Sequence, residues 1–194
     1  MIPSFRECLD LVWFRKSAVG EMKKARQILQ SVLDRNPDHG QSLLLLGRII
    51  LSTGQPSEAE ATLRHAAEVL PFDYQAQWQL YQCLNRQEGK SAEAQSQLAF
   101  AEQLRKRYLQ KSELTTKLSV RPHDASLHYE MGMLLMQLGH KELGAKWLSS
   151  ALQEKPDYPE ARDALVAYLR EVGRTEVADE LGGGTPSPSF EGQH

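Results

Sequence analysis

A chain of 194 residues is long enough to bury a hydrophobic core, and its 41% hydrophobic and 25% charged residues exclude a disordered protein. Lysine and arginine number 23 against 25 acidic residues, and the net charge of −2 argues against nucleic-acid binding driven by phosphate contacts. No apolar run approaches the roughly 20 residues of a membrane span, no secretory signal is visible, and the two cysteines suggest free thiols, so we expect a cytoplasmic protein.

The chain repeats itself every 34 residues. Pro37 and Pro71 are 34 residues apart, and so are Pro122 and Pro156. The same spacing joins further pairs of one residue type, namely Gly20 with Gly54, Ala25 with Ala59, Leu29 with Leu63, and Gly139 with Gly173. A period of this length is typical of stacked repeats, each of which is one supersecondary unit.

The pattern within each repeat predicts two amphipathic helices. Apolar residues recur at intervals of three and four, which is the helical period, and no segment alternates as a strand would. A glycine falls at the break between the two helices, and a proline follows the second helix as a stop. Asp38 and Asp73, which come after two of these prolines, are expected to cap the next helix. In chain order, the five copies run from Leu9 to Pro37, Leu43 to Pro71, Ala76 to Ala101, His128 to Pro156 and Ala161 to Ala178.

The third copy departs from the period, because Pro122 follows Pro71 only after 51 residues. We therefore expect its second helix to continue from Ser91 to about Val120, with its buried face rotated by roughly a quarter turn. The alternative is two helices with a break near 110–112. The predicted organisation is repeats one to three over 4–108, the end of the long helix and a turn over 109–124, repeat four and a capping partial repeat over 125–181, and a disordered tail over 182–194.

A 34-residue helix–turn–helix unit with this pattern of small and large residues and a terminal proline resembles the tetratricopeptide repeat (TPR) family. The resemblance covers about 6–181 and is fullest in copies two and four, where Gly47, Ala59 and Gly132 stand where two helices approach closely. It implies an all-α, right-handed solenoid of about four repeats with a C-terminal capping helix, and one elongated helix near 91–120.

The sequence contains no constellation that indicates catalysis. Cys8 and Cys83 lie in different copies, and neither belongs to a Cys-x-x-Cys pair. His123 and His128 are five residues apart, which differs from the spacing of a zinc-binding histidine pair on a helix. His128 also occupies a position that is apolar in the other copies, which favours a packed histidine. We expect no catalytic residue, cofactor or metal, although a fold alone does not exclude an enzyme.

The resemblance implies a partner site, because in TPR proteins the first helix of each repeat lines a concave groove. A second apolar stripe with isolated arginines lies beside the core positions of these helices, and such a surface suits an apolar or amphipathic segment. The candidate groove residues are Phe14, Leu44, Arg48, Leu51, Trp78, Gln82, Arg86, Tyr129, Met133 and Met136. We expect partial exposure of Leu44, Arg48, Trp78, Tyr129, Met133 and Met136, beside a buried set of Leu43, Leu46, Met131 and Leu135. The alternative is that the second stripe is buried between neighbouring repeats.

Some TPR proteins hold the acidic C-terminal tail of heat-shock chaperones through a clamp of lysines and asparagines. The clamp positions correspond here to Asp10, Phe14, Leu45, Gln75 and Gln79, none of which is lysine or asparagine. The resemblance therefore does not carry that specificity over to this chain.

We interpret the chain as a non-catalytic scaffold that binds a protein or peptide segment in the concave groove. The alternative is an assembly subunit of an enzyme or a membrane-associated complex that uses the convex face or the long helix. The basic run on that helix, Arg105, Lys106, Arg107 and Lys111, is typical of a solvated face. RNA binding is disfavoured, because the repeats lack polar base-reading positions and the basic run lacks interleaved aromatic residues.

Overall fold

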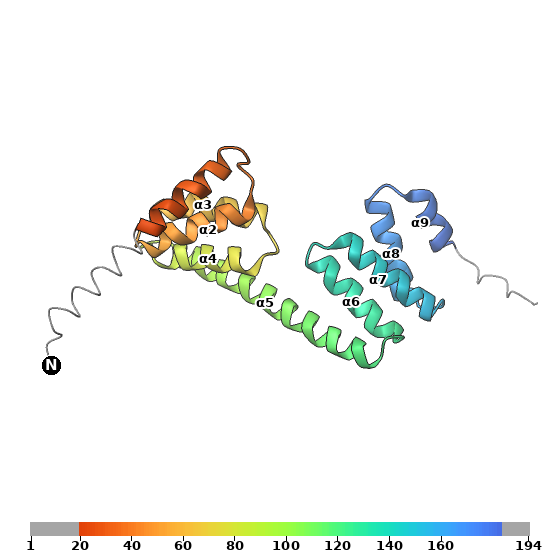
Figure 1. Ribbon diagram of the computed structural model, residues 1–194. Helices are drawn as coiled ribbons and strands as arrows, with labels where there is room; N and C mark the ends of the chain where they lie inside the picture. Colours follow the sequence, from red (N-terminus) through yellow and green to blue (C-terminus); the bar gives the residue numbers. More distant parts are fainter. Residues whose placement is uncertain (1–19, 184–194) are drawn as a thin grey trace, which may run out of the picture. The chain divides into compact units, whose positions relative to one another are not determined.

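The computed structural model describes residues 20–183, and every regular element in that range is an α-helix (Figure 1). The predicted all-α fold class is confirmed. The chain divides into two compact units, whose boundary falls between Leu104 and Arg105 within one helix. The first helix predicted for copy one, over 1–19, and most of the predicted tail, over 184–194, lie outside the described residues.

Each unit is built from consecutive helix pairs. Unit 1 contains a helix over 20–33 and then α2 (Gly40–Ser52), α3 (Pro56–Val69), α4 (Tyr74–Asn85) and α5 (Ser91–Val120) as far as Leu104. Unit 2 contains the rest of α5, followed by α6 (Ala125–Gln137), α7 (Lys141–Glu154), α8 (Pro159–Glu171) and α9 (Thr175–Gly182). From α2 onwards, successive helices are the first and second helices of copies two to five. Within 20–183, no helix combines the length and the apolar character that crossing a membrane requires.

A glycine in the left-handed region makes the turn inside each of the helix pairs of copies two to five. The φ angles lie between 78° and 80° at Gly54, Gly89, Gly139 and Gly173. Side chains other than glycine rarely adopt this conformation, so the repeated glycine is required by the turn. The second helices end shortly before Pro37, Pro71, Pro122 and Pro156. The breaks predicted at Gly54 and Gly139 and the proline stops are therefore confirmed.

Aspartates cap two of the first helices. Oδ1 of Asp73 accepts hydrogen bonds from the backbone N–H groups of Gln75 at 2.7 Å and Ala76 at 3.1 Å, at the start of α4. Asp124 caps α6 in the same way. The side-chain oxygen thereby satisfies N–H groups that have no partner inside the helix. The cap predicted at Asp73 is confirmed.

The cap predicted at Asp38 is wrong. Oδ1 of Asp38 lies 2.8 Å from Nε2 of His65 on α3, so this carboxylate is engaged by another helix. His39, one residue further along, caps α2 in its place, because its Nδ1 accepts a hydrogen bond from the backbone N–H of Ser42 at 3.3 Å. Asp38 thus bonds to His65 of α3, and the cap of α2 falls one residue later.

The two helices of a pair approach each other closely at glycines. A Cβ atom on Gly47 of α2 would lie 2.4 Å from Cδ2 of Leu63 on α3, far inside van der Waals contact. Gly132 of α6 repeats this arrangement, since a Cβ there would lie 2.9 Å from Cγ of Leu148 on α7. Leu63 and Leu148 are fully buried at these contacts. The glycines therefore let the side chains of the second helix fill the space that a Cβ would take.

Helix α5 is continuous from Ser91 to Val120, so the predicted long helix is confirmed and the alternative break does not occur. Its buried residues change face along its length, from Ala94 and Ala101 in the first half to Leu114 and Leu118 in the second. Leu118 follows Ala101 by 17 residues, and at about 100° per residue this spacing amounts to roughly a quarter turn. One helix therefore contributes different faces to the cores of the two units.

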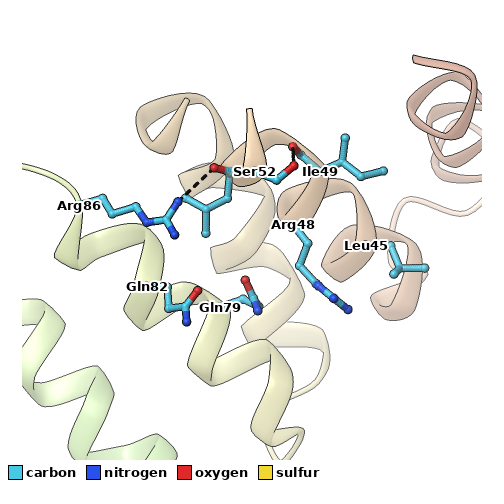
Figure 2. Close-up of a pocket in the computed structure, with 8 residues that line it drawn as sticks. Leu45, Arg48, Ile49, Ser52, Gln79, Gln82 and Arg86 are labelled. Carbon is cyan, nitrogen blue, oxygen red and sulfur yellow. Dashed lines mark hydrogen bonds between the residues drawn. The ribbon is translucent and has the colours of Figure 1, made fainter. Parts of the chain in front are cut away.

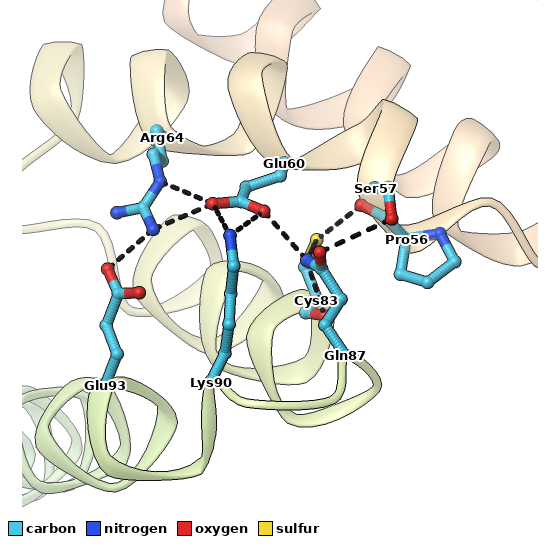
Figure 3. A network of polar contacts seen from close by, with 8 residues as sticks. All are labelled: Pro56, Ser57, Glu60, Arg64, Cys83, Gln87, Lys90 and Glu93. Atoms are coloured by element: carbon cyan, nitrogen blue, oxygen red, sulfur yellow. Dashed lines mark hydrogen bonds and ion pairs between the residues drawn. The ribbon is translucent and has the colours of Figure 1, made fainter.

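A polar network fastens α5 to α3 in unit 1 (Figure 3). The carboxylate of Glu60 on α3 accepts hydrogen bonds from Lys90, Gln87 and Arg64, and Arg64 also pairs with Glu93 of α5. The hydrogen bond from Lys90, together with those from Gln87 and Arg64, lowers the pKa of Glu60 from 4.5 to about 2. The side chain of Glu60 is only 15% exposed, so its charge depends on these partners more than on water.

Replacing Gly47 with alanine should lower the free energy of unfolding by about 1–3 kcal/mol, because the added methyl group collides with Leu63. Urea unfolding measures this change in free energy. Gly20→Ala is the control, since a Cβ on Gly20 would have no described atom within 4 Å. This variant should leave the free energy of unfolding unchanged or slightly raised. Equal stability of Gly47→Ala and the wild type would contradict the close approach of α2 and α3.

Glu60→Gln should lower the free energy of unfolding by about 1–3 kcal/mol near neutral pH, because it removes the charge that Lys90 and Arg64 bind. The folded pKa lies below the unfolded value, so this stabilisation is present above pH 4.5 and is lost as the pH falls towards 2. Urea unfolding at several pH values should therefore show the wild type and the variant converging in acid. The control Glu93→Gln, at a side chain that is 46% exposed, should cost no more than about 0.5 kcal/mol. A difference that does not change with pH would contradict this account.

Candidate functional site

The first helices of copies two and three form a pocket in unit 1 (Figure 2). Its volume of about 350 Å³ is at the lower end of the range for ligand pockets. Helices α2 and α4, with the residue that ends α4, supply its walls: Leu45, Arg48, Ile49, Leu51, Ser52, Gln79, Gln82 and Arg86. The pocket thus lies on the helices that the sequence assigns to a groove.

The described wall of this pocket is cationic and contains no acidic side chain. Arg48 is the one charged residue of α2, α4 has none, and Arg86 follows directly after α4. Arg48 is exposed and forms no hydrogen bond or ion pair with any residue of 20–183. Nη1 of Arg86 donates to the carbonyl oxygen of Leu51 at 3.2 Å, which holds this side chain beside α2. A guanidinium has five N–H donors, so both arginines retain donors for a carboxylate.

The predicted division between buried and exposed positions holds for most of the first-helix residues. The buried set is confirmed at Leu43, Leu46, Met131 and Leu135. Partial exposure is confirmed at Arg48, Trp78, Tyr129, Met133 and Met136. Phe14, the candidate from copy one, lies outside the described residues.

The predicted exposure of Leu44 is wrong. Leu44 is 4% exposed and Leu51 is 2% exposed, and both belong to the hydrophobic core of unit 1. They lie seven residues apart on one face of α2, and α2 packs against α4. Leu45, about 100° further around the helix, is 45% exposed and lines the pocket. For Leu44, the alternative of burial between neighbouring repeats is therefore correct.

On α4, the candidate residues lie on two different faces. Gln82 lines the pocket together with Gln79. Trp78 does not line it, and its ring contacts Tyr74 and Tyr81 of the same helix with centroid distances of 6.0 and 5.0 Å. The side chain of Trp78 therefore belongs to a surface other than the pocket.

Unit 2 has a smaller pocket of about 240 Å³ in a corresponding place, and its walls are mainly apolar. It is lined by Met133 and Met136 of α6, Lys141 of α7, and Ala164, Ala167, Tyr168 and Glu171 of α8. Lys141 and Glu171 form an ion pair, so the two charges neutralise each other. Tyr129 packs beside this region, with its ring 5.3 Å from that of Tyr158.

Several pocket residues were not among the sequence candidates. Leu45 and Gln79 correspond to positions of the TPR clamp, so the family register alone indicates that they face the groove. Ile49 and Ser52 lie one helical turn beyond Leu45 and Arg48. Residues at this spacing share a helix face, so the spacing indicates that they face the same pocket. In unit 2, Tyr168 of α8 lines the pocket. The sequence does not predict this, because it indicates a capping role for copy five.

Cys83 and His128 have structural partners. Sγ of Cys83 donates to the carbonyl oxygen of Pro56 at 3.1 Å, and burial raises the pKa of this thiol. His128 is 8% exposed, its Nε2 donates to the carbonyl oxygen of Pro122 at 2.8 Å, and its ring packs against Trp147. The predicted packed histidine is confirmed. Within 20–183, no group of three or more histidine, cysteine, aspartate or glutamate side chains is arranged to hold a metal ion.

Comparison with known proteins matches residues 18–84 to the family model described as tetratricopeptide repeat. Among solved structures, the chain is similar to MamA, with 17% identity, 86% of this chain and 88% of that chain covered, and a TM-score of 0.40. It is also similar to YrrB, described as a TPR protein with an unusual peptide-binding site, with 24% identity, 76% and 68% covered, and a TM-score of 0.39. A thermophilic TPR protein of Thermus thermophilus gives 24% identity, 88% and 84% covered, and a TM-score of 0.35. These low TM-scores support no inference about function. No curated protein matches the chain.

Leu44→Ala should lower the free energy of unfolding by about 2–5 kcal/mol, because it leaves a cavity between α2 and α4. Leu45→Ala is a matched control. It removes the same atoms from the neighbouring leucine, whose side chain is 45% exposed. It should cost less than about 1 kcal/mol. Thermal unfolding distinguishes the two positions, and equal losses would contradict the rotation of α2 described above.

Proposed function

We propose that this chain, of which residues 18–84 match the tetratricopeptide repeat family model, is a non-catalytic scaffold that binds a segment of a partner protein in the pocket between α2 and α4. The observation that supports this most strongly is Arg48. Its side chain is exposed among apolar neighbours of the pocket wall and has no ion pair within 20–183. A positioned cation beside apolar surface is suited to an anchoring contact with a partner.

The composition of the wall indicates the chemistry of the segment. Arg48 and Arg86 offer N–H donors to a carboxylate, and an arginine–carboxylate contact is directional and charge-assisted. Leu45 and Ile49 offer an apolar wall for an aliphatic side chain. Gln79, with a donor and an acceptor on one amide, can bond to the main chain of an extended peptide. We therefore infer an amphipathic segment that combines aspartate or glutamate with aliphatic residues.

The pocket of unit 2 supports a second contact of different chemistry. Met133 and Met136 are half-buried, and methionine adapts its shape to an irregular apolar partner. Because Lys141 is already paired with Glu171, this pocket offers no free charge of its own. We infer that it receives an apolar side chain.

The test begins with a library of random peptides displayed on phage, which is selected against the whole chain. Enriched peptides should combine acidic and aliphatic residues. Fluorescein-labelled copies are then titrated by anisotropy against the wild type and Arg48→Ala. The variant should bind about tenfold more weakly or worse, because a charge-assisted contact is lost. Its thermal unfolding should match the wild type, since Arg48 is exposed.

Lys106→Ala is the comparison variant, because Lys106 is an exposed basic residue on α5 outside the pocket. It should leave peptide affinity unchanged. Peptides that lose affinity with Lys106→Ala and keep it with Arg48→Ala would assign binding to the long helix, as expected for an assembly subunit. A selection that enriches no peptide would contradict the proposed groove.

A further inference from the structure

The pocket of unit 2, which we call the methionine pocket, has a chemistry that selects among apolar side chains. Met133 and Met136 line it from α6, and Tyr168 lines it from α8. A thioether sulfur makes a favourable contact with an aromatic ring, and aromatic rings also pair favourably with one another. The methionine pocket therefore favours an aromatic side chain over an aliphatic one.

The chain beyond α9 carries one aromatic side chain. Residues 184–194 lie outside the described residues, and their sequence is Gly-Thr-Pro-Ser-Pro-Ser-Phe-Glu-Gly-Gln-His. Apart from two prolines, the one large apolar residue in this segment is Phe190. Because the other residues are small, polar or charged, Phe190 is the group with which this segment can bind an apolar pocket.

Helix α9 ends beside α8, which is one of the helices that line the methionine pocket (Figure 1). A Cβ on Gly182, at the end of α9, would lie 3.7 Å from Cγ2 of Val166 on α8. Val166 belongs to the core of unit 2 and directly precedes Ala167 and Tyr168, which line the pocket. The segment 184–194 therefore starts level with the pocket, on another side of α8.

Phe190 is near enough along the chain to reach the methionine pocket. Half the circumference of a helix about 10 Å in diameter is about 16 Å. Phe190 follows Gly183 by seven residues, and a chain of that length spans at most about 23–25 Å. A tether this short gives an effective concentration in the millimolar range. A contact whose dissociation constant is itself millimolar is then occupied for a substantial part of the time.

We propose that Phe190 occupies the methionine pocket of its own chain, with its ring against Met133 and Met136. The inference rests on the function proposed for this pocket, which is to receive an apolar side chain, and it adds a regulation of that function. A partner segment must displace Phe190 before its own side chain enters. A pocket that is filled from within for two thirds of the time binds a competing segment about threefold more weakly.

Methyl NMR of the whole chain, with carbon-13 in the methionine methyl groups, tests the proposal without any peptide. Met133→Leu and Met136→Leu assign the two signals. Phe190→Ala should shift both signals, because an aromatic ring no longer lies against the two methyl groups. Ser189→Ala is the matched control, since it changes the neighbouring residue and should leave both signals in place. The signal of Met22, which belongs to unit 1, serves as the internal reference.

A variant that fills the pocket tests whether Phe190 acts there. Ala167 is exposed and lines the methionine pocket, so Ala167→Trp should fill the pocket without loss of fold. In this background, Phe190→Ala should cause no further shift of the Met133 and Met136 signals. Thermal unfolding verifies that each variant is folded. A further shift in this background would place Phe190 elsewhere and overturn the proposal.

Two other results overturn the proposal. The first is a Phe190→Ala variant in which both methyl signals stay in place. The second is a pair of wild-type signals that move on dilution from about 500 µM to about 10 µM, which would assign Phe190 to the pocket of a second copy. Selected peptides that bind through Arg48, together with unmoved methyl signals, would overturn the self-contact and leave the function proposed for unit 1. Moved methyl signals without any selected peptide would support the self-contact and contradict the groove of unit 1.

Discussion

The contact between the two helices of a pair determines the direction of every other side chain in this protein. At Gly47 and Gly132, the missing Cβ lets Leu63 and Leu148 of the second helix reach the backbone of the first. A contact this close permits one rotation of the first helix about its axis. That rotation sends Leu45 towards the pocket and Leu44, its neighbour, towards the next helix. The site therefore follows from the packing beneath it.

Local signals in the sequence predicted the helices and turns, but they did not predict how each helix is rotated about its own axis. The 34-residue period predicted the helix pairs, the glycine turns and the proline stops, because backbone conformation at those points depends on the residue itself. Leu44 and Leu45 differ in exposure by an order of magnitude, although both are leucines in one apolar run. Their roles depend on where α4 packs, and an apolar run of four leucines contains no phase information. The cap at His39 was likewise not predicted, and Asp38 instead bonds to His65 of α3.

The long helix α5 gives the two units a shared element. Its first half is fastened to α3 by the network around Glu60, and its second half buries Leu114 and Leu118. In repeat proteins, stability is approximately the sum of the repeats and of the interfaces between neighbours. A helix that serves two cores transmits fraying in one unit to the other through its own backbone hydrogen bonds. We therefore expect the end of unit 1 to unfold together with the start of unit 2. The unfolding of these two segments should be coupled more strongly than that of the outer repeats.

Charge is divided between the two helix layers of unit 1. Helix α3 carries three glutamates and Arg64, and Glu58 and Glu60 form ion pairs with basic side chains. The one charge on α2 and α4 is that of Arg48, with Arg86 beside it. A molecule with a nearly neutral total of −2 can still have a strong local field, because that field depends on where the charges lie. An anionic chain approaching within about one Debye length, some 8–10 Å in physiological salt, is drawn to the arginine side. The on-rate of such a ligand should thus decrease as ionic strength rises, while the apolar contacts that determine its residence time change little.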